Sequence, residues 1–360
     1  MPVASTSVVG APDRLELGRA ARPGLLTPSV GYKPFRYPWA YDLWRRQQQV
    51  HWMAAEVPLG EDCKDWARLS DGERALLTQV FRFFTQADVD VSDNYMERLA
   101  GVFRPTEVRM MLSAFAAMET VHIDAYSLLV DTVGLDEGEY SAFMAIAEMR
   151  DKHRFSASFS ARNPFDTLVT LATFGGFIEG LQLFASFAVL ASFPRRGLMR
   201  GMGQVVSWSV RDETLHCEGV CRLYRELRDE LLGGRDAGLT EAVARAAQEA
   251  VALEYDFMDS IFELAEDEDI GLTELEVRLY VRWVAAHRFR QLDEPVPAWL
   301  AGLVDTPHPL PWLPEVLEAV EHANFFETRA TEYSKATASG DWDQTFDMFD
   351  RSMGRTPEDG

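Results

Sequence analysis

Cysteine is scarce in this sequence, because the 360 residues include only Cys63, Cys217 and Cys221. Three scattered cysteines are too few for a disulfide framework. They form no Cys-x-x-Cys pair and no Cys/His cluster with the spacing of a zinc site, so a metal held by thiolates is not expected. Cys217 and Cys221 stand four residues apart, and we interpret them as small apolar residues on the buried face of one helix.

Positive charge is also in short supply. The chain has 35 Lys and Arg against 57 Asp and Glu, which gives a formal net charge of −22 at pH 7. A surface that binds nucleic acid needs Lys and Arg to neutralise phosphates, so this balance argues against a nucleic-acid partner. The share of hydrophobic residues, 47%, is that of an ordinary globular protein.

Long apolar runs are missing as well. No segment reaches the roughly 18 uninterrupted apolar residues of a membrane-spanning helix. The N-terminus lacks the basic residues and apolar run of a signal peptide. Strand-like alternation of useful length and internal repeats are absent too. We therefore expect an all-α protein with no membrane span, located in the cytoplasm.

Helical spacing of apolar residues is what the sequence has in abundance. Ser70-Asp71-Gly72-Glu73 is a capping box that begins a helix running towards residue 99, and Pro105 stands at the start of a helix that reaches about residue 133. Gly175, Gly176 and Gly180 interrupt another apolar helix and mark either a bend or a close approach of two backbones. Further helices are expected at residues 37–52, 139–160, 165–191, 199–232, 239–266, 272–291 and 314–326.

Three regions follow from this pattern. Residues 1–36 are rich in Pro, Gly, Ser and Ala and are predicted to be a mobile arm. Residues 37–327 should form the helical domain. Residues 328–360 lose apolar periodicity and place aromatic residues among acidic ones, so we interpret them as a flexible tail that docks a partner.

Two Glu-x-x-His motifs lie within the helical domain. Glu119 and His122 share one face of the helix that follows Pro105, and Glu213 and His216 repeat the spacing on the helix at 199–232. One such motif alone is weak evidence, since a half-buried polar pair would account for it. Two of them on apolar helices are typical of the dinuclear carboxylate site of a four-helix bundle, in which two more helices each provide one carboxylate.

Asp88 and Glu179 are the candidates for the two remaining carboxylates. Asp88 lies on the apolar helix that begins at the capping box, although Asp90 or Asp93 would also serve. Glu179 lies in the middle of an apolar helix with no other charge near it, where an unpaired carboxylate would be costly. It should therefore meet a cation, either a metal ion or, as the alternative, a core arginine such as Arg211.

This set of ligands predicts a dinuclear iron or manganese site with two ions per chain. Carboxylate oxygens combined with imidazole suit these two metals, and four carboxylates balance the charge of two divalent ions. Redox metals in a dry bundle core indicate oxygen or radical chemistry. The predicted ligands are Asp88, Glu119, His122, Glu179, Glu213 and His216.

From about residue 37 to residue 333 the sequence resembles the radical-generating β subunit of class I ribonucleotide reductase. The resemblance rests on the order and spacing of Asp88, Glu119-x-x-His122 with Tyr126 four residues on, Glu179, and Arg211-Asp212-Glu213-x-x-His216. It implies a ferritin-like helical bundle that stores one oxidising equivalent and passes it to a catalytic α subunit, which reduces ribonucleoside diphosphates. It also implies a homodimer, and long aromatic and Met-rich helices offer apolar faces for one.

The resemblance further implies roles for residues outside the ligand set. Tyr126 stands in the place of the radical tyrosine. Trp52 and Asp212 would form a hydrogen-bonded relay with His122, between the metal site and the α subunit. The tail would bind the α subunit, and Tyr333, the only tyrosine after the core, would be its relay tyrosine.

Two questions stay open at the level of sequence. Ser209, four residues before Glu213, departs from the apolar surroundings of a stable tyrosyl radical, and in some relatives a manganese-containing metal pair holds the oxidising equivalent instead. A di-iron carboxylate oxygenase or oxidase of the ferritin-like superfamily is the alternative function, against which Asp88 and the Trp52/Asp212 relay argue. Iron storage or a purely structural bundle is a third reading, but storage proteins have shorter chains and no aromatic tail.

Overall fold

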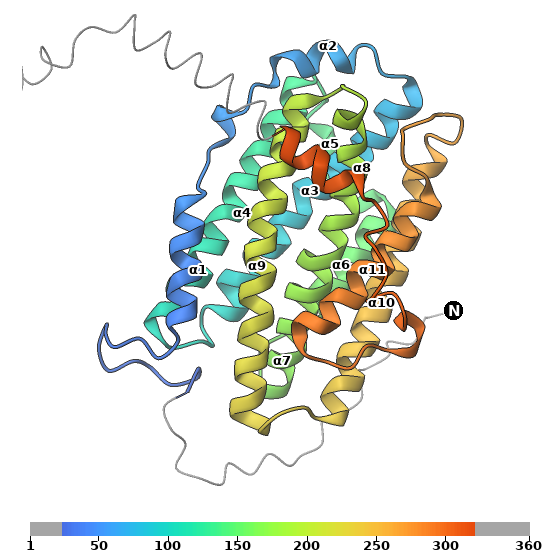
Figure 1. The fold of residues 1–360 in the computed structure, drawn as a ribbon. Coiled ribbons are helices and arrows are strands. Elements are labelled where there is room, and N and C mark those ends of the chain that lie inside the picture. Colours follow the sequence, from blue (N-terminus) through green and yellow to red (C-terminus); the bar gives the residue numbers. More distant parts are fainter. Residues whose placement is uncertain (1–23, 321–360) are drawn as a thin grey trace, which may run out of the picture.

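Long helices lying side by side form most of the structure (Figure 1). The computed structural model describes residues 24–320, and those residues contain no strand, so the prediction of an all-α fold is confirmed. The labelled α-helices of this part of the chain are α1 (Pro38–Gln49), α2 (Asp62–Trp66), α3 (Asp71–Asp93), α4 (Thr106–Thr132), α5 (Gly138–Ala142), α6 (Ala147–Ser158), α7 (Pro164–Thr173), α8 (Leu183–Arg195), α9 (Arg200–Leu232), α10 (Ala237–Glu263) and α11 (Glu274–Leu292). Residues 312–320, at the end of the described chain, are helical as well. Two segments are π-helical, η3 (Asn94–Leu99) and η5 (Phe174–Gln182), and four are short 3-10 turns, η1 (Ala54–Glu56), η2 (Leu59–Glu61), η4 (Phe143–Ala145) and η6 (Ala298–Leu300).

Four helical segments enclose the centre of the bundle. They are α3, α4, α9 and the continuous segment made of α7, η5 and α8. α3 packs on α4 and α8, α4 packs on α9, and α9 packs along all three parts of the continuous segment. α1 lies against α4 and α9 on one side of this core, whereas α10 and α11 lie on the other side (Figure 1).

Local sequence signals explain where these helices begin and end. The Ser70 hydroxyl accepts a hydrogen bond from Glu73 N, and the Glu73 carboxylate accepts one from Ser70 N, so the predicted capping box begins α3. Asn163 caps α7, with Pro164 in its first turn. Gly233 ends α9 with a φ of 73°, in the left-handed region that glycine adopts at no steric cost.

Two expected elements differ from the structure. The predicted helix at 139–160 is divided into α5, η4 and α6, because the backbone is extended at Ile146. The glycines of the apolar helix lie in or beside η5, where the chain approaches its neighbours closely. A Cβ atom on Gly175 would lie 2.6 Å from Val220 Cγ1, and one on Gly180 would lie 2.7 Å from Arg288 Nε. Of the two predicted explanations for these glycines, the structure therefore shows the close approach.

The continuous segment Pro164–Arg195 is the most apolar helical stretch of the described chain that also has the length to cross a membrane. Its most apolar window is 94% buried within the protein. α9, α10 and α11 all pack against it. This apolar segment therefore lies in the interior of the helical bundle.

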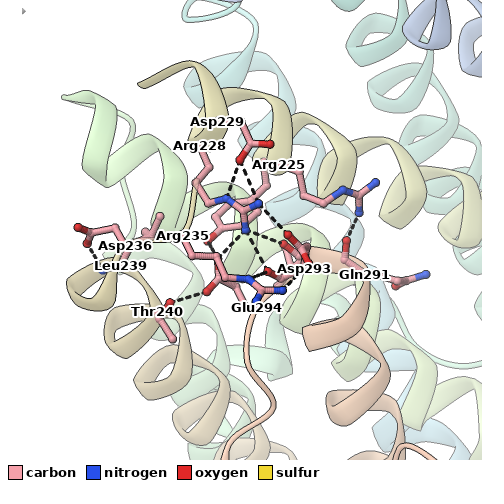
Figure 2. A network of polar contacts seen from close by, with 12 residues as sticks. Arg225, Arg228, Asp229, Arg235, Asp236, Leu239, Thr240, Gln291, Asp293 and Glu294 are labelled. Atoms are coloured by element: carbon pink, nitrogen blue, oxygen red, sulfur yellow. Dashed lines mark hydrogen bonds and ion pairs between the residues drawn. The ribbon is translucent and has the colours of Figure 1, made fainter. Parts of the chain in front are cut away.

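A buried polar network ties the end of α9 to the end of α11 (Figure 2). Arg228, which is 2% exposed, donates to Glu294 Oε1 from Nη1 and to Asp293 Oδ2 from Nη2, each at 2.9 Å. The Tyr224 hydroxyl donates to the same Glu294 oxygen at 2.8 Å. The network fixes the position of the helix that carries the second Glu-x-x-His motif.

Residues 24–36, which belong to the predicted N-terminal arm, make specific contacts with the bundle. Leu25 is fully buried, its N–H donates to Glu230, and its carbonyl accepts from Arg104 N. The backbone N–H groups of Arg36 and Tyr37 both donate to Glu107 Oε1. This part of the predicted arm is attached to the helices.

Candidate metal centre

The six predicted ligands meet at one place in the centre of the bundle. Asp88 comes from α3, Glu179 comes from η5, and α4 and α9 each contribute one Glu-x-x-His motif. All six side chains are 0 or 1% exposed. Their oxygen and nitrogen atoms form two groups that share Glu119, one with Asp88 and His122 and the other with Glu179, Glu213 and His216.

The two motifs face each other across the site. His216 Nδ1 lies 2.9 Å from Glu119 Oε1, and His122 Nδ1 lies 3.3 Å from Glu213 Oε1. Each imidazole is therefore directed at the glutamate of the other helix as well as at its own. The centroids of the two histidine rings are 6.4 Å apart. The i and i+3 spacing places each pair on the inner face of its helix, as the sequence predicts.

The alternatives for the two single carboxylates do not fit the structure. Asp90 Oδ2 lies 2.6 Å from His153 Nδ1, away from the cluster, and Asp93 is exposed. Among the described residues no arginine pairs with Glu179, whose charged neighbour at 3.9 Å is His216. Arg211 Nη2 donates instead to the carbonyl of Val50.

Many of the buried oxygen and nitrogen atoms of the predicted ligands lack hydrogen bonds to the described residues. This holds for Oδ2 of Asp88 and for both carboxylate oxygens of Glu119, Glu179 and Glu213. It also holds for both ring nitrogens of His216. Buried polar groups in proteins almost always have a hydrogen-bond partner. The described residues around these atoms do not provide one, which is typical of atoms that bind a metal ion.

The electrostatics of the site point to cations as those partners. Burial raises the pKa of Asp88 and Glu179 well above their ordinary values, and neighbouring carboxylates add to the effect. Burial alone would lower the pKa of His216, but contacts with Glu119 and Glu213 outweigh it and raise the pKa to about 10. The ionised carboxylates are thus disfavoured by burial and by one another, and a bound cation would stabilise them. Carboxylates with imidazoles are the donors that iron and manganese accept, so the residues present fit two such ions.

Asp212 connects the predicted ligand His122 with two further buried residues, Trp52 and Gln47. Its Oδ2 lies 3.3 Å from His122 Nε2 and accepts a hydrogen bond of 2.8 Å from the indole N–H of Trp52. Its Oδ1 accepts from the Gln47 side chain at 2.9 Å. With Asp212 as acceptor, His122 carries its proton on Nε2 and directs Nδ1 at the carboxylate cluster. Trp52 is itself buried, but both of its neighbours in the chain, His51 and Met53, are exposed.

Tyr126 is fully buried in an aromatic cage beside the cluster. Its ring stacks on Phe84 with centroids 4.4 Å apart, and Phe84 stacks on Phe187 at 5.0 Å. Burial, then the charge of Asp88, raises the pKa of Tyr126 well above its ordinary value, so the phenol stays protonated. Ser209 faces the phenol and opposes this shift, but neither hydroxyl has a hydrogen bond of ordinary geometry to a described residue.

Sequence reasoning missed two residues of this region, Gln47 and Tyr95. Gln47 was detectable in principle, because it lies on the buried face of α1, four residues after Leu43, where a polar residue needs a partner. Tyr95 was detectable only from its spacing, seven residues after Asp88, because an aromatic residue on the apolar face of a helix is ordinary. It lies in η3, is fully buried, and its ring stands edge-on to His216 with centroids 6.0 Å apart.

Tyr333 and the aromatic residues of the predicted tail lie outside the described residues. The other nine predicted site residues lie within them. All nine are buried, and they form one connected set around the carboxylate cluster: Trp52, Asp88, Glu119, His122, Tyr126, Glu179, Asp212, Glu213 and His216.

Two Glu-x-x-His helices and two further carboxylate helices around a shared buried site define a dinuclear carboxylate protein of the ferritin-like kind. The family model described as "Ribonucleotide reductase, small chain" matches residues 29–296, which is most of the chain. The chain therefore belongs to the ribonucleotide reductase small-chain family, as the sequence resemblance predicts. Family membership and the buried cluster together support a dinuclear metal site.

Individual relatives agree with this assignment. The chain is 38% identical over 354 residues to the probable ribonucleoside-diphosphate reductase small subunit 376L of Invertebrate iridescent virus 6. The matched region covers 87% of this chain and 96% of that protein. The ribonucleotide reductase R2 subunit from Clostridium botulinum has the same fold, with a TM-score of 0.72, 19% identity, and coverage of 86% of this chain and 99% of that one. The dimanganese(II)-NrdF structure from Streptococcus sanguinis matches with a TM-score of 0.65 and 16% identity, over 80% of this chain and 99% of that one. The predicted ferritin-like fold is confirmed.

Proposed function

We propose that this chain is the subunit of a class I ribonucleotide reductase that assembles a dinuclear metal cofactor and supplies an oxidising equivalent to a catalytic α subunit, which reduces ribonucleoside diphosphates. The observation that carries the proposal is the position of Asp212. One of its oxygens contacts both the Nε2 of a predicted metal ligand, His122, and the indole of Trp52. An enzyme that used its oxidant on a substrate bound beside the metals would not need such a connection towards the surface.

The six clustered side chains would hold two ions of iron or manganese, with Glu119 belonging to both groups of ligands. Once oxidised by oxygen or a reduced oxygen species, the metals would supply the oxidising equivalent. The protein's own contribution is to bind the ions in fixed geometry and to exclude water, since all six ligands are buried. Asp212 would hold His122 in one tautomer and orientation.

Tyr126 is our candidate for the group that stores the equivalent. Its phenol keeps its proton, because burial and the charge of Asp88 raise its pKa, so oxidation must remove a proton together with an electron. Phe84 and Phe187 form an apolar wall beside it that keeps reductants away. Trp52 and Asp212 would carry electron and proton between His122 and the docked α subunit.

The partners follow from the same proposal. The α subunit would bind the C-terminal tail, residues 328–360, with Tyr333 in the relay, and the chain would act as a homodimer in the cytoplasm. The acidic composition gives no reason to expect a nucleic-acid partner.

The test is reconstitution of ribonucleotide reduction. The full chain, loaded with iron or manganese and oxidised, is mixed with the α subunit of the same host, and reduction of cytidine diphosphate is measured. Trp52→Phe should keep two metals per chain and lose nearly all turnover. Trp39→Phe, a second buried tryptophan whose indole N–H has no hydrogen bond to a described residue, is the matched control and should stay active.

A truncation after residue 335 completes this experiment. It should keep its metals but no longer co-purify with the α subunit. Full activity of Trp52→Phe, or metal-dependent oxidation of a small molecule without any α subunit, would contradict the proposed function and favour an oxygenase or oxidase.

A further inference from the structure

Tyr95 is a second tyrosine at the metal site, distinct from Tyr126. It lies on η3, directly after α3, seven residues beyond Asp88, so two helical turns bring both residues to the same inner face. Its ring is fully buried and stands edge-on to His216, at 6.0 Å, and to Phe115, at 5.9 Å. The two tyrosines serve different parts of the site, because Asp88 is the main charged neighbour of Tyr126 and Glu179 is that of Tyr95.

The hydroxyl of Tyr95 and the carboxylate of Glu179 are both without hydrogen bonds of ordinary geometry to the described residues. Each group is fully buried, and leaving either unpaired is costly. They are nevertheless neighbours. The Tyr95 ring stands edge-on to His216, whose Nδ1 lies 3.9 Å from Glu179 Oε1, and the Glu179 charge adds to the rise that burial causes in the pKa of Tyr95. A buried donor and a buried acceptor thus lie beside the same imidazole in a dry site.

The surroundings of Glu179 contain no other donor of this kind among the groups that act on it. Its other polar neighbours, Glu119, Glu213 and His216, are predicted metal ligands. Arg288 lies against Gly180, the residue after Glu179, but it donates its Nε–H to the carbonyl of Gly180. Phe115, which contacts both the Tyr95 and the His216 rings, is apolar.

We propose that Tyr95 is a positioning residue for the metal ion held by Glu179 and His216: its phenol donates a hydrogen bond to one carboxylate oxygen of Glu179 while the other oxygen binds the ion. The proposal rests on the dinuclear site of the proposed function. A hydrogen bond to the outer oxygen of a metal-binding carboxylate fixes the rotation of that carboxylate, and the loss of such a partner typically costs about 10–100-fold in metal affinity.

The test is a titration of the metal-free full chain with Mn(II) without oxygen, with the free ion measured by electron paramagnetic resonance. The wild-type chain should bind two ions. Tyr95→Phe should bind one ion as the wild type does and the other about 10–100-fold more weakly. Tyr224→Phe is the matched control, because Tyr224 is equally buried but its hydroxyl donates to Glu294, in the network at the end of α9. It should bind both ions normally.

Thermal unfolding of the metal-free proteins separates positioning from structure. Tyr95→Phe removes a buried oxygen that bonds no described residue, so its melting temperature without metal should be no lower than that of the wild type. An unchanged titration, an equal loss at both ions, or a lower melting temperature without metal would overturn the proposal. A wild-type chain that fails to bind two ions would instead contradict the proposed function itself.

Discussion

His122 Nε2 and Asp212 Oδ2 lie 3.3 Å apart, on the neighbouring helices α4 and α9. This contact gives the buried imidazole a fixed orientation and joins it to Trp52, which donates to the same oxygen. Because Asp212 directly precedes Glu213 in sequence, the helix that supplies two of the predicted metal ligands also orients a predicted ligand on the facing helix. The contact therefore joins the same two helices that carry the Glu-x-x-His motifs.

Asp212→Asn should test that contact. The amide keeps the shape of the side chain but has one acceptor oxygen and no charge, so it cannot serve His122, Trp52 and Gln47 together. With metals supplied in excess, turnover with the α subunit should fall by about 10–100-fold. Asp90→Asn is the control, since Asp90 contacts His153 outside the cluster. Wild-type turnover in Asp212→Asn would show that the contact has no role.

Glu179→Ala and His216→Ala should each lower metal content sharply. Each removes a buried ligand from the group that surrounds one ion. Elemental analysis of the purified proteins measures the effect, and a result of two metals per chain in either variant would refute the ligand assignment. His153→Ala and His308→Ala are controls that should leave the metal content unchanged, because His153 contacts Asp90 and His308 packs against Tyr280 and Trp283.

The sequence was sufficient to locate the ligand cluster because its main signal is local. Glu-x-x-His places two ligands on one helical face without any knowledge of the fold, and a lone Glu179 in an apolar helix demands a cation whatever surrounds it. Each of these inferences needed only residues within a few positions of one another. The role of Asp212, beside Glu213, was instead implied by the family resemblance.

The features that sequence analysis missed depend on contacts between distant parts of the chain. Gln47 contacts Asp212 across 165 positions, and Tyr95 reaches Glu179 from a separate helix. The π-helical segment η5 is also a tertiary effect, since Gly175 and Gly180 must fit against Val220 and Arg288 from other helices. Periodicity predicts a helix there but gives no reason for the wider turn.

Glu294→Ala should destabilise the fold without touching the metal ligands. Glu294 is 4% exposed and accepts from Arg228 and Tyr224, so its removal takes from the buried Arg228 its one buried carboxylate partner among the described residues and leaves the more exposed Asp229 and Asp293. Loss of one member of a buried ion pair typically costs about 3–5 kcal/mol in the free energy of unfolding. Denaturant unfolding of the metal-free protein measures this cost. Glu241→Ala, which removes half of an exposed pair with Arg245, should change stability little, and equal effects in the two variants would show that the network in Figure 2 contributes no more than a surface pair.

Tyr126→Phe separates storage of the oxidising equivalent on tyrosine from storage on the metals. The substitution removes a hydroxyl that has no hydrogen bond to a described residue and keeps the ring that stacks on Phe84, so the variant should fold and bind both metals. If the phenol stores the equivalent, nearly all turnover should be lost, because phenylalanine cannot give up a proton with an electron.

The polar neighbour Ser209 is the reason why storage on Tyr126 and storage on the metals both have to be tested. Its hydroxyl faces the phenol and opposes the rise in the pKa of Tyr126, so the surroundings of the ring are less apolar than a long-lived radical favours. Ser209→Ala is therefore the companion variant. It should lengthen the lifetime of a tyrosyl signal in the paramagnetic spectrum if Tyr126 is the storage site. Substantial turnover in Tyr126→Phe, together with a multiline metal signal, would exclude tyrosine storage and leave the ligand assignment intact.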